Sequence, residues 1–166
     1  MGKNPTDRGK KGTKKSVLVD GAGGPLGMVI APANVNDQKL LRETIESIVV
    51  ERPVPTAEKP QHLCLDAAYD NPTGREAAAA GKYTAHIRRV REEKKPCDQA
   101  KGEKPRRWVV ERMFAWLSKL HAILVRYDKK DENYLGLLQL ACTLVWYRRL
   151  YRLGRHDAKQ GRRRGS

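Results

Sequence analysis

Residues 61–70 have the sequence QHLCLDAAYD, and this stretch decides which class of fold the chain adopts. Residues 62–65 form a brief apolar run, which predicts a buried strand. The run ends at Asp66, and Asn71 followed by Pro72 is typical of a helix start, with asparagine at the cap and proline at the first helical position. The central prediction is therefore a strand that ends in an aspartate and leads into a helix.

Strands and helices alternate on either side of this stretch. Residues 16–20 and 26–31 are rich in Val and Ile and flank a glycine-rich turn, which predicts a hairpin. Helices are expected over residues 36–50, 71–81, 106–121 and 132–153, a further strand over 83–87, and a loop over 88–107. Such alternation predicts an α/β layered domain with a long C-terminal helix.

Local residue choice adds detail to two of these helices. Asn36 or Asp37 is expected to cap the helix over residues 36–50. Cys64 and Cys142 lie in apolar runs and are expected to be small core residues, and the three cysteines show no zinc-ligand spacing. The apolar face expected for the final helix consists of Leu135, Leu138, Cys142, Val145 and Trp146.

The composition is typical of a globular protein with one domain. The chain has 166 residues, of which 39% are hydrophobic and 32% charged, a mixture that disfavours a disordered or a membrane protein. It contains no apolar run long enough to span a bilayer and no secretory signal, so the expected location is the cytoplasm, with no membrane partner.

Positive charge is the strongest global signal. The 34 Lys and Arg residues against 19 Asp and Glu give a net charge of +15, and such a surplus attracts nucleic-acid phosphates. Six basic residues lie in 1–15 and eight in 148–166. We therefore expect a basic arm over residues 1–15, a domain over 16–153 and a basic tail over 154–166, although two merely solvated tails would also explain the charge.

Two acidic residues are candidates for metal-dependent chemistry. Asp66 follows a strand, where functional groups gather in open α/β sheets, but a capping aspartate is the alternative. Glu111 borders the apolar arc of the helix over residues 106–121 and aligns with Arg107 one turn earlier, so an ordinary Arg–Glu helix pair is the alternative there. An Asp and a Glu on separate elements suit Mg²⁺ in two-metal phosphoryl transfer.

Several motifs in series resemble the DDE transposases of bacterial insertion sequences. They are Thr6-Asp7-Arg8-Gly9-Lys10 with Gly12-Thr13-Lys14, Asp20-Gly21 with Gly24-Pro25-Leu26, Ala33-Asn34 with Asn36-Asp37, Leu65-Asp66-Ala67-Ala68-Tyr69-Asp70, Arg106-Arg107-Trp108-Val109-Val110-Glu111-Arg112, and Val125-Arg126-Tyr127-Asp128-Lys129 with Asn133-Tyr134-Leu135. The resemblance covers about residues 4–150.

The resemblance implies an RNase H-like fold, with a mixed sheet, flanking helices and a DDE triad that holds Mg²⁺ or Mn²⁺ in a two-metal site. By motif, Asp66 matches the second catalytic acid and Glu111 the third, and both would be metal ligands. The family cuts DNA at the terminal inverted repeats of its element and joins the 3′-hydroxyls to target DNA. It therefore implies DNA as partner and a bacterial, nucleoid-associated location.

Six basic residues are the expected DNA contacts. Family members often carry an Arg four residues before the Glu, and Arg107 matches. They often carry a Tyr three residues before that Arg and a Lys seven residues after the Glu, where this chain has Lys104 and Ser118. The expected contacts are Lys14, Lys15, Arg106, Arg107, Arg112 and Lys119.

The first acid of the triad has no counterpart. In the family it lies on a first, central strand upstream of the basic glycine-rich segment, where this chain begins, and neither Asp7 nor Asp20 takes its place. Without that strand, the hairpin and the Asp66 strand would have unpaired edges and an incomplete core. We therefore expect a downstream reading frame joined to an upstream one by frameshifting, or a truncated remnant.

Three hypotheses follow. The chain is a DDE transposase segment that is active once it is completed by an upstream segment or an oligomer of itself. Alternatively, it is a catalytically inactive DNA-binding fragment that regulates or inhibits full-length transposase, as its charge permits. An unrelated RNA-binding protein is the third hypothesis, but an aromatic-rich strand motif is lacking.

Overall fold

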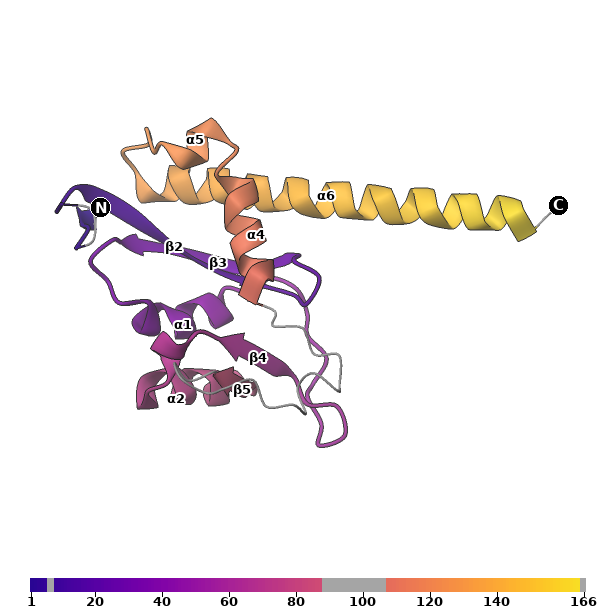
Figure 1. The fold of residues 1–166 in the computed structure, drawn as a ribbon, viewed down its shortest axis with the longest axis horizontal. Coiled ribbons are helices and arrows are strands. Elements are labelled where there is room, and N and C mark those ends of the chain that lie inside the picture. The colour runs from indigo at the N-terminus through magenta and orange to yellow at the C-terminus, as the bar shows by residue number, and fades with distance from the viewer. Residues whose placement is uncertain (6–7, 88–106, 165–166) are drawn as a thin grey trace. The chain divides into compact units, whose positions relative to one another are not determined.

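The computed structural model describes residues 1–5, 8–87 and 107–164, with side chains for all of these except 107 and 154–164. The chain divides into two units, Met1–Met113 and Phe114–Ser166. The first contains β1 (Gly2–Lys3), β2 (Lys11–Val19), β3 (Pro25–Pro32), α1 (Asp37–Glu46), β4 (His62–Leu65), the 3-10 helix η1 (Ala67–Tyr69), α2 (Pro72–Ala80), β5 (Thr84–Ile87) and the beginning of α4 (Arg107–Leu117) (Figure 1). The second contains the end of α4, α5 (His121–Leu124) and α6 (Asp131–Arg164).

The predicted hairpin is present and is longer than expected. β2 pairs with β3 in antiparallel fashion, and β1 pairs with the start of β2. Asp20 holds the turn, because its Oδ1 accepts hydrogen bonds from the N–H groups of Ala22 and Gly24 at 2.9 and 2.7 Å. Since strand pairing begins at Lys11, residues 11–15 of the predicted arm belong to the sheet.

The strand predicted over residues 62–65 is β4, and it pairs in parallel with β5. In the part of the chain that the structure describes, β4 and β5 form a sheet separate from β1, β2 and β3. An α/β class is therefore confirmed, whereas the expected single mixed sheet is not formed by these residues. Because β4 has a strand partner along only one edge there, the RNase H-like arrangement remains a prediction.

The core of the first unit lies between α1, α2 and the parallel sheet. It consists of Leu41 and Ile45 of α1, Leu63 of β4, and Ala77 and Ala78 of α2. The N-cap of α1 is Asn36, as predicted, and its side chain accepts a hydrogen bond from the N–H of Gln38 at 3.2 Å. The helix ends at Glu46, four residues earlier than predicted, and Ser47 caps it.

Strand alternation corrects one prediction about this core. Leu63 is buried, whereas Cys64 is exposed, so the prediction that Cys64 is a core residue is wrong. The cause is the period of two in a strand, which directs neighbouring side chains to opposite faces of the sheet. Cys142 is half-buried, and burial raises the pKa of its thiol to about 11. The loop expected over residues 88–107 lies almost wholly outside the described residues.

The second unit packs α5 and the start of α6 around Leu117 and Leu138, which are fully buried. The Tyr134 hydroxyl donates a hydrogen bond to the carbonyl of Ile123 at 2.7 Å. This contact turns Tyr134 inward, so the buried face of α6 is Tyr134, Leu138 and Ala141. Of the five residues predicted for that face, only Leu138 is buried, and the other four are half-buried.

Two helix boundaries in this unit differ from the prediction. The helix expected over residues 106–121 ends at Leu117, and the short helix α5 follows after a turn. The final helix continues to Arg164, so most of the predicted tail has a helical backbone. No helix among the described residues is both long enough and apolar enough to cross a membrane.

Truncation of Leu138 should destabilise the second unit. Leu138→Ala removes a fully buried side chain and leaves a cavity, so we expect a loss of roughly 2–5 kcal/mol in the free energy of unfolding. The matched control is Leu153→Ala on the same helix, where the side chain is 55% exposed. Chemical denaturation measures both variants, and equal losses would contradict this assignment of the core.

Candidate functional site

Asp66 lies at the carboxyl end of β4 and is exposed to solvent. It is the N-cap of η1, and its Oδ1 accepts a hydrogen bond from the N–H of Ala67 at 2.7 Å. The capping role raised as an alternative from sequence is therefore confirmed. It does not compete with metal binding, because a carboxylate has two oxygens and several lone pairs. The cap fixes the direction of the side chain at the strand end.

Tyr69, at the end of η1, is half-buried beside two carboxylates. Burial raises its pKa to about 12, and the negative charges of Asp37 and Asp66 act in the same direction. Asp37 belongs to the first turn of α1 and Asp66 follows β4, so carboxylates from two different elements act on the Tyr69 hydroxyl. At neutral pH the Tyr69 hydroxyl keeps its proton and remains an uncharged hydrogen-bond donor.

Lys14 of β2 contacts the start of α1 through Asp37. Its Nζ lies 3.1 Å from Asp37 Oδ1 and donates a hydrogen bond to the Val35 carbonyl at 2.8 Å. The first turn of α1 is also tied to η1, because Gln38 Nε2 donates to the Ala68 carbonyl at 2.6 Å. The beginning of α1 is thus fixed against both β2 and the segment that carries Asp66.

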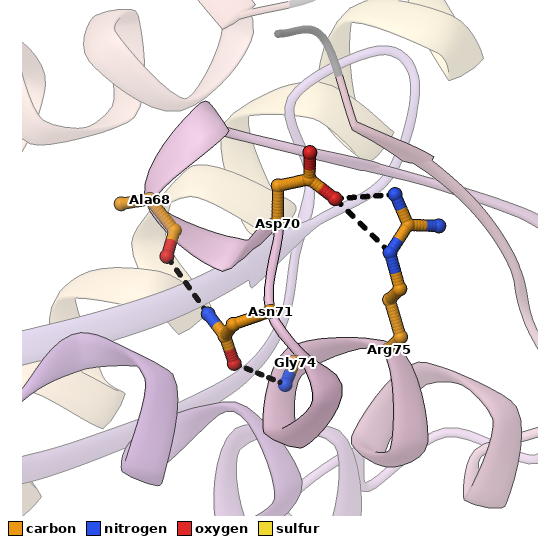
Figure 2. Close-up of polar contacts among 5 residues, drawn as sticks. All are labelled: Ala68, Asp70, Asn71, Gly74 and Arg75. Atoms are coloured by element: carbon orange, nitrogen blue, oxygen red, sulfur yellow. Dashed lines mark hydrogen bonds and ion pairs between the residues drawn. The ribbon is translucent and has the colours of Figure 1, made fainter.

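The segment between Asp66 and α2 is held by side-chain contacts (Figure 2). Asn71 caps α2 as predicted, with its Oδ1 accepting from the N–H of Gly74 at 2.9 Å and its Nδ2 donating to the Ala68 carbonyl at 3.0 Å. Asp70 forms an ion pair with Arg75, and Arg75 Nε donates to Asp70 Oδ1 at 3.0 Å. These contacts fix η1 against the first turn of α2.

Glu111 lies on α4 and is exposed, as its position at the border of the apolar arc predicts. The neighbouring Arg112 reaches the turn of the hairpin, where its Nη2 donates to the Ala22 carbonyl at 2.9 Å. The guanidinium also lies over the Trp108 ring, 4.4 Å from the ring centroid. The helical turn that carries Glu111 is therefore fixed to the hairpin turn within the first unit.

Gly23 makes this contact possible. Its φ is +91°, a backbone conformation that side-chain-bearing residues rarely adopt, and a Cβ there would lie 2.7 Å from Arg112 Nη2. The glycine-rich turn therefore serves close packing against α4, rather than only reversing the chain.

The predicted DNA contacts are placed in different surroundings. Lys119 is exposed in the second unit, and Lys15 is half-buried, with a pKa lowered by burial. Lys14 and Arg112 are engaged with other parts of the first unit, as described above. The side chains of Arg106 and Arg107 lie outside the described residues. A DNA-binding role remains a prediction for all six.

The two predicted acids belong to the same unit, but they do not form a complete metal site by themselves. Among the residues that the structure describes, no three His, Cys, Asp or Glu side chains are arranged to hold a metal ion. Asp66 and Glu111 are nevertheless exposed carboxylates, the ligand type that Mg²⁺ takes through one or two side chains plus substrate phosphates. The donor chemistry therefore fits a divalent ion shared with DNA.

The sequence motifs contain Asp37 and Tyr69 but do not indicate that either lies near Asp66. The local pattern predicts Asp37 only as a possible helix cap, because its effect on the pKa of Tyr69 depends on folding across 32 positions. Both residues lie within the motifs that resemble the family, and this position is the sequence feature that could have marked them as site candidates.

Comparisons with known proteins indicate the family of the chain. A family model described as the transposase DDE domain matches residues 2–146. A protein of Burkholderia cepacia, named as a transposase for insertion sequence element IS402, is 31% identical over 153 residues, which is 91% of this chain and 70% of that protein. No solved structure matches the chain.

Substitution of Gly74 should loosen the segment that carries Asp66. A Cβ at this position would lie 2.4 Å from the Tyr69 carbonyl oxygen, so Gly74→Ala must displace η1 or α2. We expect a loss of about 1–3 kcal/mol in the free energy of unfolding, because backbone cannot yield as a flexible side chain can. Chemical denaturation measures it. The control is Thr73→Ala, an exposed neighbour, and an unchanged stability for Gly74→Ala would contradict the close packing.

Proposed function

Because this chain belongs to the transposase DDE domain family, we propose that it provides the catalytic segment for DNA cleavage and strand transfer at the ends of an insertion sequence. The family match covers residues 2–146, which include both candidate acids. Transfer of phosphoryl groups on DNA is the reaction class of this family. The observation that carries the proposal is the exposed carboxylate of Asp66 at a strand end, inside a motif of that family.

Asp66 and Glu111 are the proposed metal-binding carboxylates. The η1 cap orients Asp66, and the Arg112–Ala22 hydrogen bond fixes the turn of α4 on which Glu111 lies. Divalent ions, when bound with DNA, would stabilise the attacking and leaving oxygens of an in-line displacement. Both carboxylates are exposed, so a phosphodiester can approach them.

Tyr69 is a candidate for contact with the DNA substrate near Asp66. Its hydroxyl remains protonated at neutral pH because its pKa is about 12. It therefore adds no negative charge where phosphates would bind, and it offers a donor to a phosphate oxygen. The Lys14–Asp37 ion pair keeps the same region from becoming a cluster of unpaired carboxylates.

We also propose that catalysis needs a further strand beside β4, which the described residues do not supply. β4 has a strand partner on its β5 side only, within the described part of the chain. The other edge presents backbone N–H and C=O groups in the arrangement to which a further strand pairs. A strand bearing the first acid, from an upstream segment or another polypeptide, would bring a third carboxylate next to Asp66.

A regulatory DNA-binding product is the second candidate function. The net charge of +15 supports it, because such a chain binds DNA whether or not it cleaves DNA. In that case the chain would compete with full-length transposase for element ends.

Removal of either carboxylate should abolish the chemistry but leave DNA binding intact. We expect Asp66→Asn and Glu111→Gln in the completed transposase to lower Mg²⁺-dependent cleavage by at least ~10²-fold, because each variant loses a metal ligand. DNA affinity, measured by fluorescence anisotropy, should change by less than ~3-fold. Glu76→Gln, an exposed acid of α2, is the matched control. Strand transfer at the wild-type rate in either variant would remove that residue from the site.

A complementation assay separates the two candidate functions. The isolated chain should bind terminal-repeat DNA with a steep dependence on salt, since binding releases counterions. We expect Mg²⁺-dependent cleavage to arise only when an upstream segment is co-expressed with it. If the completed mixture stays inactive and the chain instead inhibits full-length transposase, the regulatory function replaces the catalytic one.

A further inference from the structure

Two histidines face each other across the parallel sheet of the first unit. His62 belongs to β4 and His86 to β5, and Nδ1 of the first ring lies 2.7 Å from Nε2 of the second. The ring centroids are 4.7 Å apart, and both side chains are exposed. At this distance one ring donates its N–H to the lone pair of the other. Two nitrogens of the kind that ligate metals therefore converge on one point, and the function proposed above uses neither of them.

The register of the sheet explains why the two rings meet. His62 pairs with Thr84, which precedes His86 by two residues, so the histidines are diagonal neighbours on adjacent strands. Side chains alternate between the two faces of a strand. Leu63, next to the first histidine, belongs to the core, and Ala85, next to the second, packs against it. The core therefore holds the backbone of both strands, while the rings lie on the solvent side.

The separation of the two nitrogens is close to that of a metal-bound pair. With metal–nitrogen bonds of about 2.0–2.1 Å and tetrahedral angles, two ligating nitrogens lie roughly 3.3 Å apart. The pair needs to open by only about 0.6 Å to reach this spacing, and exposed side chains can rotate to supply it. In the metal-bound pair each neutral ring turns its lone pair inward and keeps one N–H on its outer nitrogen. The ring that donates in the metal-free pair therefore changes its tautomer.

Imidazole nitrogens select the class of metal. Neutral imidazole suits Zn²⁺, Cu²⁺ and Ni²⁺, whereas Mg²⁺ takes oxygen ligands. Because the described part of the chain has no cluster of three His, Cys, Asp or Glu side chains arranged to hold a metal ion, the protein would supply two ligands here and water the others. The pair thus differs in chemistry from the carboxylates proposed for the catalytic metal.

We propose that His62 and His86 form a binding site for a divalent transition metal, with Zn²⁺ as its representative, that links β4 to β5. Each of these strands has only four residues, so a metal link adds to a small number of backbone hydrogen bonds. The two ligands are 24 positions apart and meet only after folding, so the metal would stabilise the folded chain. The proposal is independent of the DNA chemistry and needs no catalytic activity.

Calorimetric titration of the full-length chain with Zn²⁺ tests the site. Excess Mg²⁺ is present to occupy oxygen-ligand sites. We expect about one Zn²⁺ per chain with a Kd of about 10–100 μM, weaker than at a four-ligand site. His62→Gln and His86→Gln should each weaken binding by at least ~10-fold, because each removes one of two ligands. His121→Gln, which changes an exposed histidine of the second unit, is the matched control and should alter the Kd by less than ~2-fold.

Thermal unfolding gives a second measurement that does not involve DNA. At about ten times its Kd, Zn²⁺ should raise the Tm of the wild-type chain by roughly 3–6 °C. It should leave the Tm of His62→Gln and of His86→Gln unchanged. Since both rings are exposed, neither substitution removes core packing, and circular dichroism of the metal-free variants checks that they are folded.

Four results would overturn the proposal. The first is a wild-type Kd for Zn²⁺ above ~1 mM, and the second is equal weakening by His121→Gln. The third is displacement of the bound Zn²⁺ by Mg²⁺, because imidazole ligands do not favour that ion. The fourth is a loss of binding in Cys64→Ser as large as in the histidine variants, since the thiol and not the imidazole pair would then hold the metal.

Discussion

The first unit depends on the burial of Leu63, the one buried side chain of β4, in a cluster with residues of α1 and α2. Leu63 shares a buried cluster with Ala77 and Ala78 of α2 and with Leu41 and Ile45 of α1. A four-residue strand contributes few hydrogen bonds of its own, so its position is set by this packing. Asp66 follows Leu63 by three residues, so the packing that holds Leu63 in the core also restricts the position of the Asp66 backbone.

Around this core, polar contacts connect elements that would otherwise be independent. Lys14 and Gln38 attach the start of α1 to β2 and to η1, and Asn71 attaches α2 to η1. Arg112 plays the same role for α4, through the hairpin turn. Each contact acts on backbone or on a partner next to a candidate site residue, so the positions of the two acids rest on a scaffold of hydrogen bonds rather than on their own loops.

Within the described residues, β4 has a strand partner only on its β5 side. Among the same residues, Leu140, Leu144, Tyr147 and Tyr151 of α6 are exposed. A strand edge pairs with a further strand through backbone hydrogen bonds, whereas exposed apolar side chains on a helix pack through shape and buried area.

The sequence by itself indicated the longer helices and strands and the two candidate acids. Asn36 and Asn71 as caps, Pro72 at a helix start, and the apolar run ending at Asp66 are local signals, because caps and short strands depend on neighbouring residues. The family motifs likewise lie in short, continuous stretches. Exposure of Glu111 followed from helical periodicity alone.

Only the tertiary structure decided the rest. It separated the strands into two sheets, exposed Cys64, turned Tyr134 inward on α6 and joined Arg112 to Ala22, which is 90 positions away. It also placed Asp37 and Asp66 near one phenol. The physical reason is that burial and long-range hydrogen bonds depend on which faces meet after folding. A residue pattern fixes the faces that an element has, but the packing partners determine which of them is covered.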